Sequence, residues 1–459
     1  MQQAKRYFFS GIGGSGMLPL AMIARARGAE VRGSDRSRDQ GRSTEKFAWL
    51  EAKGIRLFAQ DGSGIESADQ TLVASAAVEA TVPDVARASD LGCPRITRAE
   101  LNAAFFNAAA ARIGVGGTSG KSTVTGMIGW ILHRAGRNPT VMNGAVMRNF
   151  ARGDEAFASA LIGGTDAYIS EVDESDGSIA LYNPTIAVVT NISLDHKSLA
   201  ELHGLFGDFV RKAAHPIVNA DDPESAPLLG SGAIRFGFDE SADVRGVDFR
   251  AEPFGSHFGV IAGGSRHDCF IRMPGRHNAA NALAAIAATR AAGVPVAESV
   301  AALADFTGLA RRYEVIGTAR GVTVIDDFAH NPDKVAATLA AVATQPGRAL
   351  LFFQPHGYGP LRQMGKELAA SFASGMRAHD RLWVCDPVYF GGTVDRSVGS
   401  EAFVADIATH GARATHLATR EECAAAMLAE AREGDRILIL GARDDTLTEF
   451  AGEILSGLV

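Results

Sequence analysis

Short apolar segments alternate with helical patterns along almost the whole chain. This alternation is typical of an α/β fold in which parallel sheets are covered by helices on both faces. Helical patterns run over Thr125–Ala135 and, in an alanine-rich form, over Asn278–Ala292. The apolar segments predict β-strands at Arg6–Ser10, Glu30–Gly33, Gln70–Ala74, Thr185–Asn191, Val322–Ile325, Ala349–Phe353, Arg381–Cys385 and Arg436–Leu440.

The same pattern divides the chain into three units. A length of 459 residues with 46% hydrophobic residues is enough for about three domains, each with its own core. We expect domains at residues 1–102, 103–307 and 308–459. No long proline-rich stretch separates them, so the junctions are expected to be short hinges.

Charge and composition indicate which classes of binding partner are not expected. The chain carries 45 basic and 52 acidic residues, a formal net charge of −7, and no basic block. Nucleic acid and anionic membranes are therefore not expected as partners. Four scattered cysteines without a CxxC pair, and the lack of an apolar run of membrane-spanning length, predict a reduced, soluble and cytoplasmic protein.

The strongest chemical signal is the segment 113–123, IGVGGTSGKST. A glycine-rich turn between a strand and a helix can surround a polyphosphate with N–H groups, while its lysine reaches the terminal oxygens and its serine binds Mg²⁺. Gly116 and Gly120 are separated by three residues rather than four, which argues against an ordinary kinase or GTPase. A purely structural turn is the weaker reading because a helical pattern follows GKS directly. The predicted ATP-binding residues are Gly117, Thr118, Ser119, Gly120, Lys121, Ser122 and Thr123.

A second glycine turn follows the first predicted strand. It fits GxGxxG and comprises Gly11, Gly13, Gly14, Ser15 and Gly16. Asp35 ends the next strand pattern 19 residues later, as in a dinucleotide-binding unit. Taken alone this pattern favours NAD weakly, since any nucleotide diphosphate conjugate offers the same group to a helix start. A simple tight turn is the alternative.

Carboxylates and a histidine follow two strands near the phosphate loop. Glu171 ends one apolar segment, and Asp195 and His196 come just after the strand Thr185–Asn191. Oxygen ligands suit Mg²⁺, and a neutral histidine can join them at a metal. Isolated acidic runs are usually solvated turns, but their position after strands in an ATP-binding domain favours a metal site.

Five ordered motifs resemble the Mur ligase family of peptidoglycan synthesis, and they cover nearly the whole chain. They read GIGGSGM, GTSGKST, EVDESD with NISLDH, MPGRHNAANALAA, and DDFAHNPDK. The resemblance implies an N-terminal Rossmann-like domain for a UDP-sugar, a central ATPase domain, and a C-terminal Rossmann-like domain that closes over ATP and brings the amino acid. Within the family, the branch that adds L-alanine is most similar, and the branch that reuses murein tripeptide is next.

The resemblance also assigns roles to residues. It places Gly11, Gly13, Gly14, Ser15 and Gly16 at the UDP diphosphate, with Asp35 near the uridine and His356 and Arg362 at substrate. It makes Lys121, Glu171 and His196 catalytic, with Mg²⁺ held by Ser122, Glu171 and His196. Further ATP contacts are implied for Asn278 and Asn281 at the adenine, and for Asp326, Asp327 and His330 at ribose and phosphate.

The implied reaction is ATP-dependent amide formation between an amino acid, expected to be L-alanine, and the carboxylate of UDP-N-acetylmuramate through an acyl phosphate. The base that deprotonates the amine stays open, because a metal-bound His196 has no spare lone pair. Alternatives are a murein tripeptide ligase, a paralogue of altered specificity, an NAD(P)-dependent oxidoreductase and a regulatory nucleotide-binding module. The chain is expected to act as a monomer or homodimer.

Three positions depart from the family pattern. Ser119 stands where histidine or asparagine is common, and Gly357 to Leu361 lacks the arginines that usually follow the QPH motif of alanine ligases. Such arginines would grip a carboxylate in bidentate fashion, so their loss bears on the identity of the amine substrate. Some family members have a carbamylated lysine, and Lys212 lies one residue out of register with it. We place Lys212 outside the site.

Overall fold

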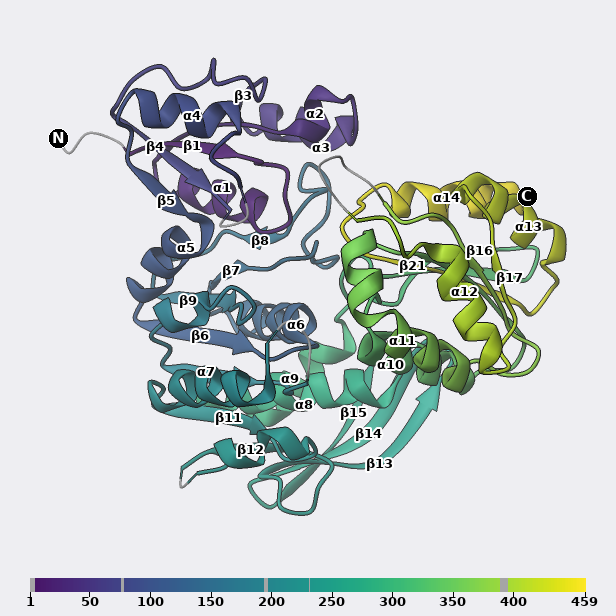
Figure 1. Cartoon of the computed structure of the whole chain (residues 1–459). Helices are drawn as coiled ribbons and strands as arrows, with labels where there is room; N and C mark the ends of the chain where they lie inside the picture. Colours follow the sequence, from purple (N-terminus) through teal and green to yellow (C-terminus); the bar gives the residue numbers. More distant parts are fainter. Residues whose placement is uncertain (1–4, 76–77, 194–196, 231, 389–394) are drawn as a thin grey trace. The chain divides into compact units, whose positions relative to one another are not determined.

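The computed structural model describes residues 5–75, 78–193, 197–230, 232–388 and 395–459. Three mainly parallel sheets with flanking helices follow one another along the chain (Figure 1). This confirms the predicted three-domain α/β fold. Two compact units emerge from the contacts: one comprises residues 1–249, 258–272 and 278–309, and the other comprises 250–257, 273–277 and 310–459.

The first sheet is parallel and has the strand order β3-β2-β1-β4-β5. The chain runs outward from β1 to β3 and then returns to the other side of β1, so the loop after β1 lies at the point where the strand order reverses. Such switch points hold ligands in open α/β sheets. The elements are β1 (Arg6–Ser10), α1 (Met17–Ala26), β2 (Glu30–Ser34), α2 (Arg36–Asp39), α3 (Thr44–Ala52), β3 (Arg56–Phe58), β4 (Gln70–Ala74), α4 (Pro83–Asp90), β5 (Arg95–Thr97) and α5 (Arg98–Asn107).

The second sheet has ten strands in the order β15-β14-β13-β12-β11-β10-β6-β9-β7-β8. Its central strand β6 is parallel to β9 on one side and β10 on the other. The strands are β6 (Ala111–Gly116), β7 (Thr140–Met142), β8 (Ala160–Leu161), β9 (Ala167–Glu171), β10 (Ile186–Val189), β11 (His215–Asn219), β12 (Ile234–Gly237), β13 (Val244–Glu252), β14 (Gly255–Ala262) and β15 (Ser265–Ile271). The helices are α6 (Lys121–Arg134), α7 (Leu199–Arg211), α8 (Arg276–Ala291), α9 (Val296–Ala304) and two 3₁₀ turns, Ser178–Leu181 and Pro223–Leu228.

The third sheet has the order β16-β17-β21-β18-β19-β20, with only the β16–β17 pair antiparallel. Both faces are buried: Leu351 and Phe353 of β18 pack with α10, α11 and α12, whereas Leu350 and Phe352 pack with α13 and α14. Burial on both faces explains the continuous apolar strands of the sequence. The elements are β16 (Glu314–Ala319), β17 (Val322–Asp327), α10 (Pro332–Ala343), β18 (Ala349–Gln354), α11 (Tyr358–Gly375), β19 (Arg381–Val384), α12 (Ser400–Thr409), β20 (Ala414–His416), α13 (Arg420–Glu430), β21 (Arg436–Gly441) and α14 (Leu447–Gly457).

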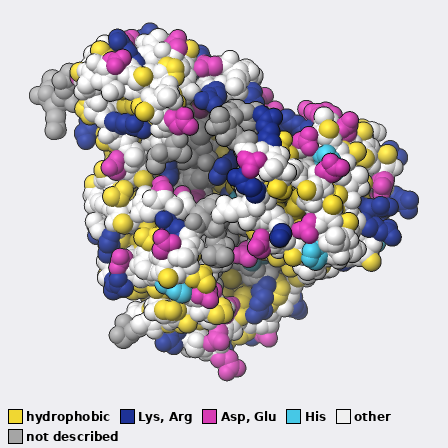
Figure 2. Space-filling view, viewed as in Figure 1, with side chains coloured by type: hydrophobic (Ala, Val, Ile, Leu, Met, Phe, Trp, Pro, Cys, Tyr) yellow, Lys and Arg dark blue, Asp and Glu magenta, His cyan; other side chains and the backbone are white. Residues whose placement is uncertain are grey.

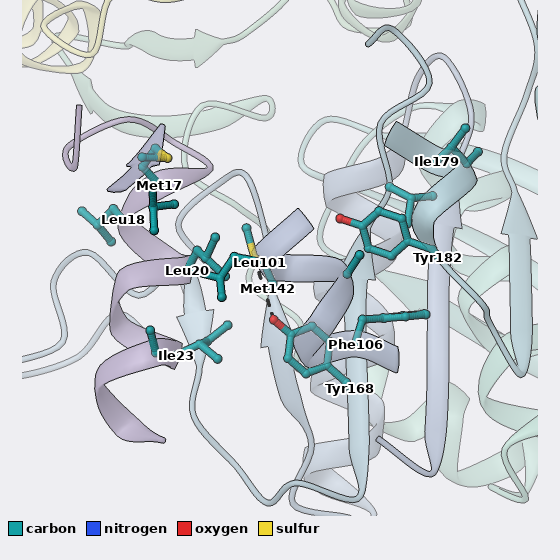
Figure 3. Packing of buried hydrophobic residues seen from close by; sticks show 14 of the residues in the cluster. Met17, Leu18, Leu20, Ile23, Leu101, Phe106, Met142, Tyr168, Ile179 and Tyr182 are labelled. Atoms are coloured by element: carbon teal, nitrogen blue, oxygen red, sulfur yellow. Dashed lines mark hydrogen bonds between the residues drawn. The ribbon is translucent and has the colours of Figure 1, made fainter. Parts of the chain in front are cut away.

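One continuous core joins the first two sheets. Met17, Leu20 and Ile23 of α1 belong to the same buried cluster as Met142 and Tyr168 of the second sheet (Figure 3). Helix α5 lies between the two sheets (Figure 1). Its buried Asn102 donates to Ser170 Oγ and Tyr182 Oη, both at 2.9 Å, and accepts from Tyr168 Oη at 2.8 Å. These buried hydrogen bonds fix the first sheet on the second, since each is costly to leave unmade.

The outer surface carries no dominant charge on the face drawn. Figure 2 shows Lys and Arg side chains interspersed with Asp and Glu over that face. Within the described ranges, no helix is both long enough and apolar enough to cross a membrane.

Candidate active site

The segment 117–120 forms a turn between β6 and α6, at the carboxyl edge of three neighbouring parallel strands. Helix α6 begins at Lys121, four residues before the helical pattern identified in the sequence. Gly120 caps it with φ +86°, and a Cβ there would lie 2.5 Å from Asn281 Oδ1. Only glycine suits this backbone and this close approach. The N–H groups at the helix start therefore face a compact turn.

Lys121 is held at the loop by an ion pair. Its Nζ donates to Gly117 O at 2.6 Å and to the two carboxylate oxygens of buried Glu174 at 2.9 and 3.2 Å. Burial alone would lower the pKa of Lys121, but Glu174 and then Asp173 raise it above its ordinary value. The lysine is therefore a fixed cation. Sequence reasoning did not assign Glu174, although it lies within the EVDESD motif.

Ser122 and Glu171 meet beside this cation. Ser122 Oγ donates to Glu171 Oε2 at 3.1 Å, while Glu171 Oε1 accepts from Gly144 N at 2.5 Å. The structure thus brings together the hydroxyl and the carboxylate that the sequence named as metal ligands, and their role at a metal stays a prediction. The loop containing Gly144 is an addition that no motif indicated. His196, the third predicted metal ligand, lies outside the described residues, as does Asp195. Within the described ranges, His, Cys, Asp and Glu form no group of three that could hold a metal.

Two residues after β10 secure the phosphate loop from the other side. Asn191 Oδ1 accepts from Ser119 N at 2.9 Å, and Asn191 Nδ2 donates to Ser119 O at 3.0 Å. Thr190 Oγ1 also donates to Ser119 O, at 2.6 Å. Asn191 is the first residue of the NISLDH segment and Thr190 directly precedes it, but neither was predicted to act at the site. Their role is to fix the loop backbone.

We expect Asn191→Ala to raise the KM for ATP by about tenfold, because the loss of a pair of partly buried hydrogen bonds loosens the loop backbone. The affinity for the second nucleotide substrate should stay unchanged. Steady-state kinetics with ATP varied would measure the effect. Asn183→Ala, an exposed asparagine in the same unit, serves as the control. An unchanged KM for ATP in Asn191→Ala would show that the loop does not depend on this contact.

The donors of the loop fit a polyphosphate and a divalent cation. Ser119 Oγ is a buried hydroxyl without a hydrogen-bond partner among the described residues. Together with the N-terminal N–H groups of α6 and the Lys121 ammonium, this hydroxyl can donate hydrogen bonds to phosphate oxygens, which accept them. Ser122 Oγ and Glu171 Oε2 supply hard oxygen ligands of the kind that Mg²⁺ prefers.

The remaining predicted residues of the first unit lie at two places. Asn281 lies against Gly120 of the phosphate loop and donates to Asn278 Oδ1 at 3.4 Å. Thr118 is buried in the phosphate loop, and Thr123 is buried in the first turn of α6.

The glycine turn 11–16 connects β1 to α1, as predicted. Asp35 is buried and accepts from Gly13 N and Ser37 N, both at 2.8 Å, so it braces the turn and caps α2.

In the second unit, the two aspartates at the end of β17 are engaged by protein groups. Asp326 pairs with Arg311 at 3.4 Å and accepts from Thr448 Oγ1 at 2.7 Å. Asp327 accepts from Tyr313 N at 2.6 Å, and also from Ala329 N and Thr338 Oγ1. These bonds hold the loop that follows β17. A role for either aspartate at a ribose stays a prediction.

His330 and His356 lie together in the second unit. Their ring centroids are 4.9 Å apart, and His330 Nδ1 lies 2.7 Å from Phe328 O. Arg362 pairs with Asp395 at 3.0 Å at the first turns of α11. Burial, then Lys334 and His356, lower the pKa of His330 well below its ordinary value of 6.5. His330 is therefore neutral and donates its Nδ1 proton to the Phe328 carbonyl.

This neutral histidine predicts a pH dependence of stability. Because the pKa of His330 is lower in the folded state, the unfolded chain binds more protons below pH 6.5, and stability falls as the pH falls. His330→Gln should remove about 1 kcal/mol of the loss between pH 7.5 and 5.5. Urea unfolding of both proteins at the two pH values measures it. Equal losses in the two proteins would refute the assignment.

Lys212 lies at the C-terminal end of α7. Its Nζ donates to Ala180 O at 2.6 Å and to Tyr182 O at 3.2 Å. The ammonium thus closes the 3₁₀ turn Ser178–Leu181 against α7. Its exclusion from the site stays a prediction.

Family models match the chain in three successive segments. They are the Mur ligase family catalytic domain at residues 6–109, the Mur ligase middle domain at 115–289, and the Mur ligase glutamate ligase domain at 311–443. Among curated proteins, the UDP-N-acetylmuramate–L-alanine ligase of Acidothermus cellulolyticus is 35% identical over 97% of this chain and 93% of its own. The ligase of that name from Phenylobacterium zucineum is also 35% identical, over 96% and 94%.

Solved structures agree on the fold. The UDP-N-acetylmuramate-alanine ligase of Thermotoga maritima superposes with a TM-score of 0.80 at 24% identity, covering 98% of both chains. A murein peptide ligase from Psychrobacter arcticus gives 0.72 at 23% identity, covering 99% of both. With three family models in order and relatives above 30% identity over nearly the full length, this chain belongs to the Mur ligase family.

Proposed function

We propose that this ligase uses ATP and Mg²⁺ to join L-alanine to the lactyl carboxylate of UDP-N-acetylmuramate, a step of peptidoglycan precursor synthesis. The observation that carries the proposal is the meeting of Lys121, Ser122 and Glu171 at one sheet edge. The relatives named for this reaction, at up to 35% identity, support the choice of substrates. In this account residues 1–102 hold the UDP-sugar, 103–307 hold ATP, and 308–459 bring the amino acid.

Amide formation needs ATP because a carboxylate repels an amine and cannot expel oxide. A carboxylate oxygen attacks the γ-phosphorus, ADP leaves, and an acyl phosphate forms. The amine then attacks the carbonyl carbon, and the tetrahedral intermediate expels phosphate. The Lys121 ammonium stabilises the charge that develops on the transferred group. Bound Mg²⁺ would supply further charge neutralisation, with Ser122, Glu171 and His196 as its proposed ligands.

The phosphate loop itself is prepared for this task. Thr190 and Asn191 hold the loop backbone before nucleotide arrives, so little reorganisation is required at the moment of reaction. Glu174 keeps Lys121 in place in the meantime. The lysine exchanges this carboxylate for phosphate oxygens when ATP binds.

The identity of the amine substrate depends on the residues that follow the QPH motif. Arg362, the first arginine after the QPH motif, pairs with Asp395, and the N-cap of α11 is Gly357, which has no side chain to bind a carboxylate. A murein tripeptide is therefore the second candidate for the amine. Both candidates require the same carboxylate activation.

Phosphate release from ATP tests the proposal. Release should require UDP-N-acetylmuramate and an amine together, with L-alanine, other single amino acids and murein tripeptide compared at equal concentration. L-alanine should give the highest kcat/KM. A preference for tripeptide would replace the amine but keep the reaction, whereas release that ignores UDP-N-acetylmuramate would overturn the proposal.

A further inference from the structure

An arginine that no motif indicated lies against the first glycine turn. Arg98 is the first residue of α5, directly after the capping residue Thr97, and is half-buried. A Cβ built on Gly16 would lie 2.8 Å from Arg98 Cδ and 3.0 Å from Arg98 Nη1. The absence of a side chain at Gly16 therefore allows the guanidinium to approach the start of α1.

Among the described residues, no group forms a hydrogen bond or an ion pair with the Arg98 guanidinium. By contrast, Arg6 and Arg32 in the same sheet each pair with two carboxylates. A half-buried guanidinium needs an anion or ordered water to replace its lost hydration. The N–H groups of the Arg98 guanidinium are therefore suited to bind an anionic ligand.

The neighbouring backbone offers matching donors. In the glycine turn, the N–H groups of Gly11, Ile12, Gly13 and Gly14 are all engaged within the protein. Those of Ser15 and Gly16 have no acceptor among the described residues and directly precede the first residue of α1. Two backbone amides and a guanidinium therefore lie next to one another at the switch point of the first sheet.

The structure also fixes this arginine relative to the ATP loop. The positive charge of Arg98 acts to lower the pKa of Asp173 and of Tyr182, which both lie between β9 and β10 of the second sheet. One turn along α5, Asn102 is bonded to Ser170, the residue before Glu171. A group held by Arg98 is therefore held at a set distance from the carboxylate beside Ser122.

From these contacts we propose that Arg98 binds the diphosphate of the nucleotide sugar, together with the Ser15 and Gly16 amides. The inference rests on the proposed function and extends it by a specific binding residue. The guanidinium lies at Gly16 rather than at Lys121, so the anion it meets is the one bound at the start of α1. A planar guanidinium can donate to two phosphate oxygens at once, which fixes the orientation of the bound diphosphate and increases its affinity.

Isothermal titration of the full chain tests the inference with two ligands. UDP-N-acetylmuramate carries both a diphosphate and a carboxylate, whereas UDP-N-acetylglucosamine carries the diphosphate without the carboxylate. Arg98→Ala should weaken both ligands by about 10- to 100-fold, the usual range for a lost charge-assisted hydrogen bond. The Kd for ATP should stay unchanged, and Arg98→Lys should recover part of the loss.

The matched control is Arg95→Ala, an exposed arginine three residues earlier whose guanidinium donates to Val78 O and to no other described residue. It should bind all three ligands like the wild type.

Unchanged affinity for UDP-N-acetylmuramate in Arg98→Ala would overturn the inference. A loss of affinity confined to UDP-N-acetylmuramate would also overturn it, because it would assign Arg98 to the carboxylate. A parallel loss of ATP binding would reveal a structural role instead. If the wild type bound neither nucleotide sugar, the proposed function itself would fail.

Discussion

Lys121→Ala should reduce kcat by about 10²- to 10³-fold while leaving the affinity for UDP-N-acetylmuramate unchanged. The ammonium is the fixed cation of the phosphate loop, where its charge is maintained by Glu174 and Asp173. Removing it takes away stabilisation of the phosphoryl group in the transition state. The glycine turn that we propose for the UDP-sugar follows β1 of the first sheet, whereas Lys121 begins α6, which covers the second sheet. Coupled phosphate release gives kcat, and calorimetry gives the sugar affinity.

Lys366→Ala provides the control, because this lysine is exposed on α11 in the second unit. It should behave as the wild type in both assays. If Lys121→Ala lost affinity for the sugar nucleotide to the same extent as turnover, the division of the two nucleotides between two sheets would be wrong.

Glu171→Gln is the second change with a large expected effect. Glutamine keeps the shape of the side chain and an oxygen for Gly144 N, but it removes the negative charge next to Ser122. We expect kcat to fall by about 100-fold and the Mg²⁺ concentration for half-maximal rate to rise, because a neutral amide is a weaker ligand for a hard cation. Magnesium titrations of the reaction rate measure both quantities.

The control for this variant is Glu367→Gln, an exposed glutamate on α11. A Glu171→Gln protein with a lower rate but an unaltered Mg²⁺ dependence would contradict the metal role and leave Glu171 only as a partner of Gly144 and Ser122.

The sequence predicted the sheets well where strands are buried on both faces. Strands such as β18 and β21 consist of continuous apolar residues, and both were located within one residue at each end. The segment from β13 to β15 was not predicted. In β13, buried and more exposed positions alternate, and charged residues occupy the outer positions. An alternating strand of this kind gives no continuous apolar run.

The chemistry of the site was predictable where it is local in sequence. The glycine turn, Lys121, Ser122 and Glu171 were identified from motifs because each follows a strand directly. Asn191, Gly144 and Arg98 were not, because their contacts join separate segments of the chain: Gly144 and Glu171 are 27 residues apart, and Asn191 and Ser119 are 72 residues apart. The hydrogen bonds of Asp326 and Asp327 within the protein were likewise not visible in the DDFAHNP motif.

The central claim is that a carboxylate of the sugar nucleotide accepts the γ-phosphoryl group of ATP at the Lys121 loop. Supplying UDP-N-acetylmuramate with ¹⁸O in its lactyl carboxylate and analysing the released phosphate by mass spectrometry tests this step directly. One carboxylate oxygen should appear in the phosphate, since the acyl phosphate breaks at its carbonyl carbon. Phosphate free of ¹⁸O after amide formation would contradict the mechanism.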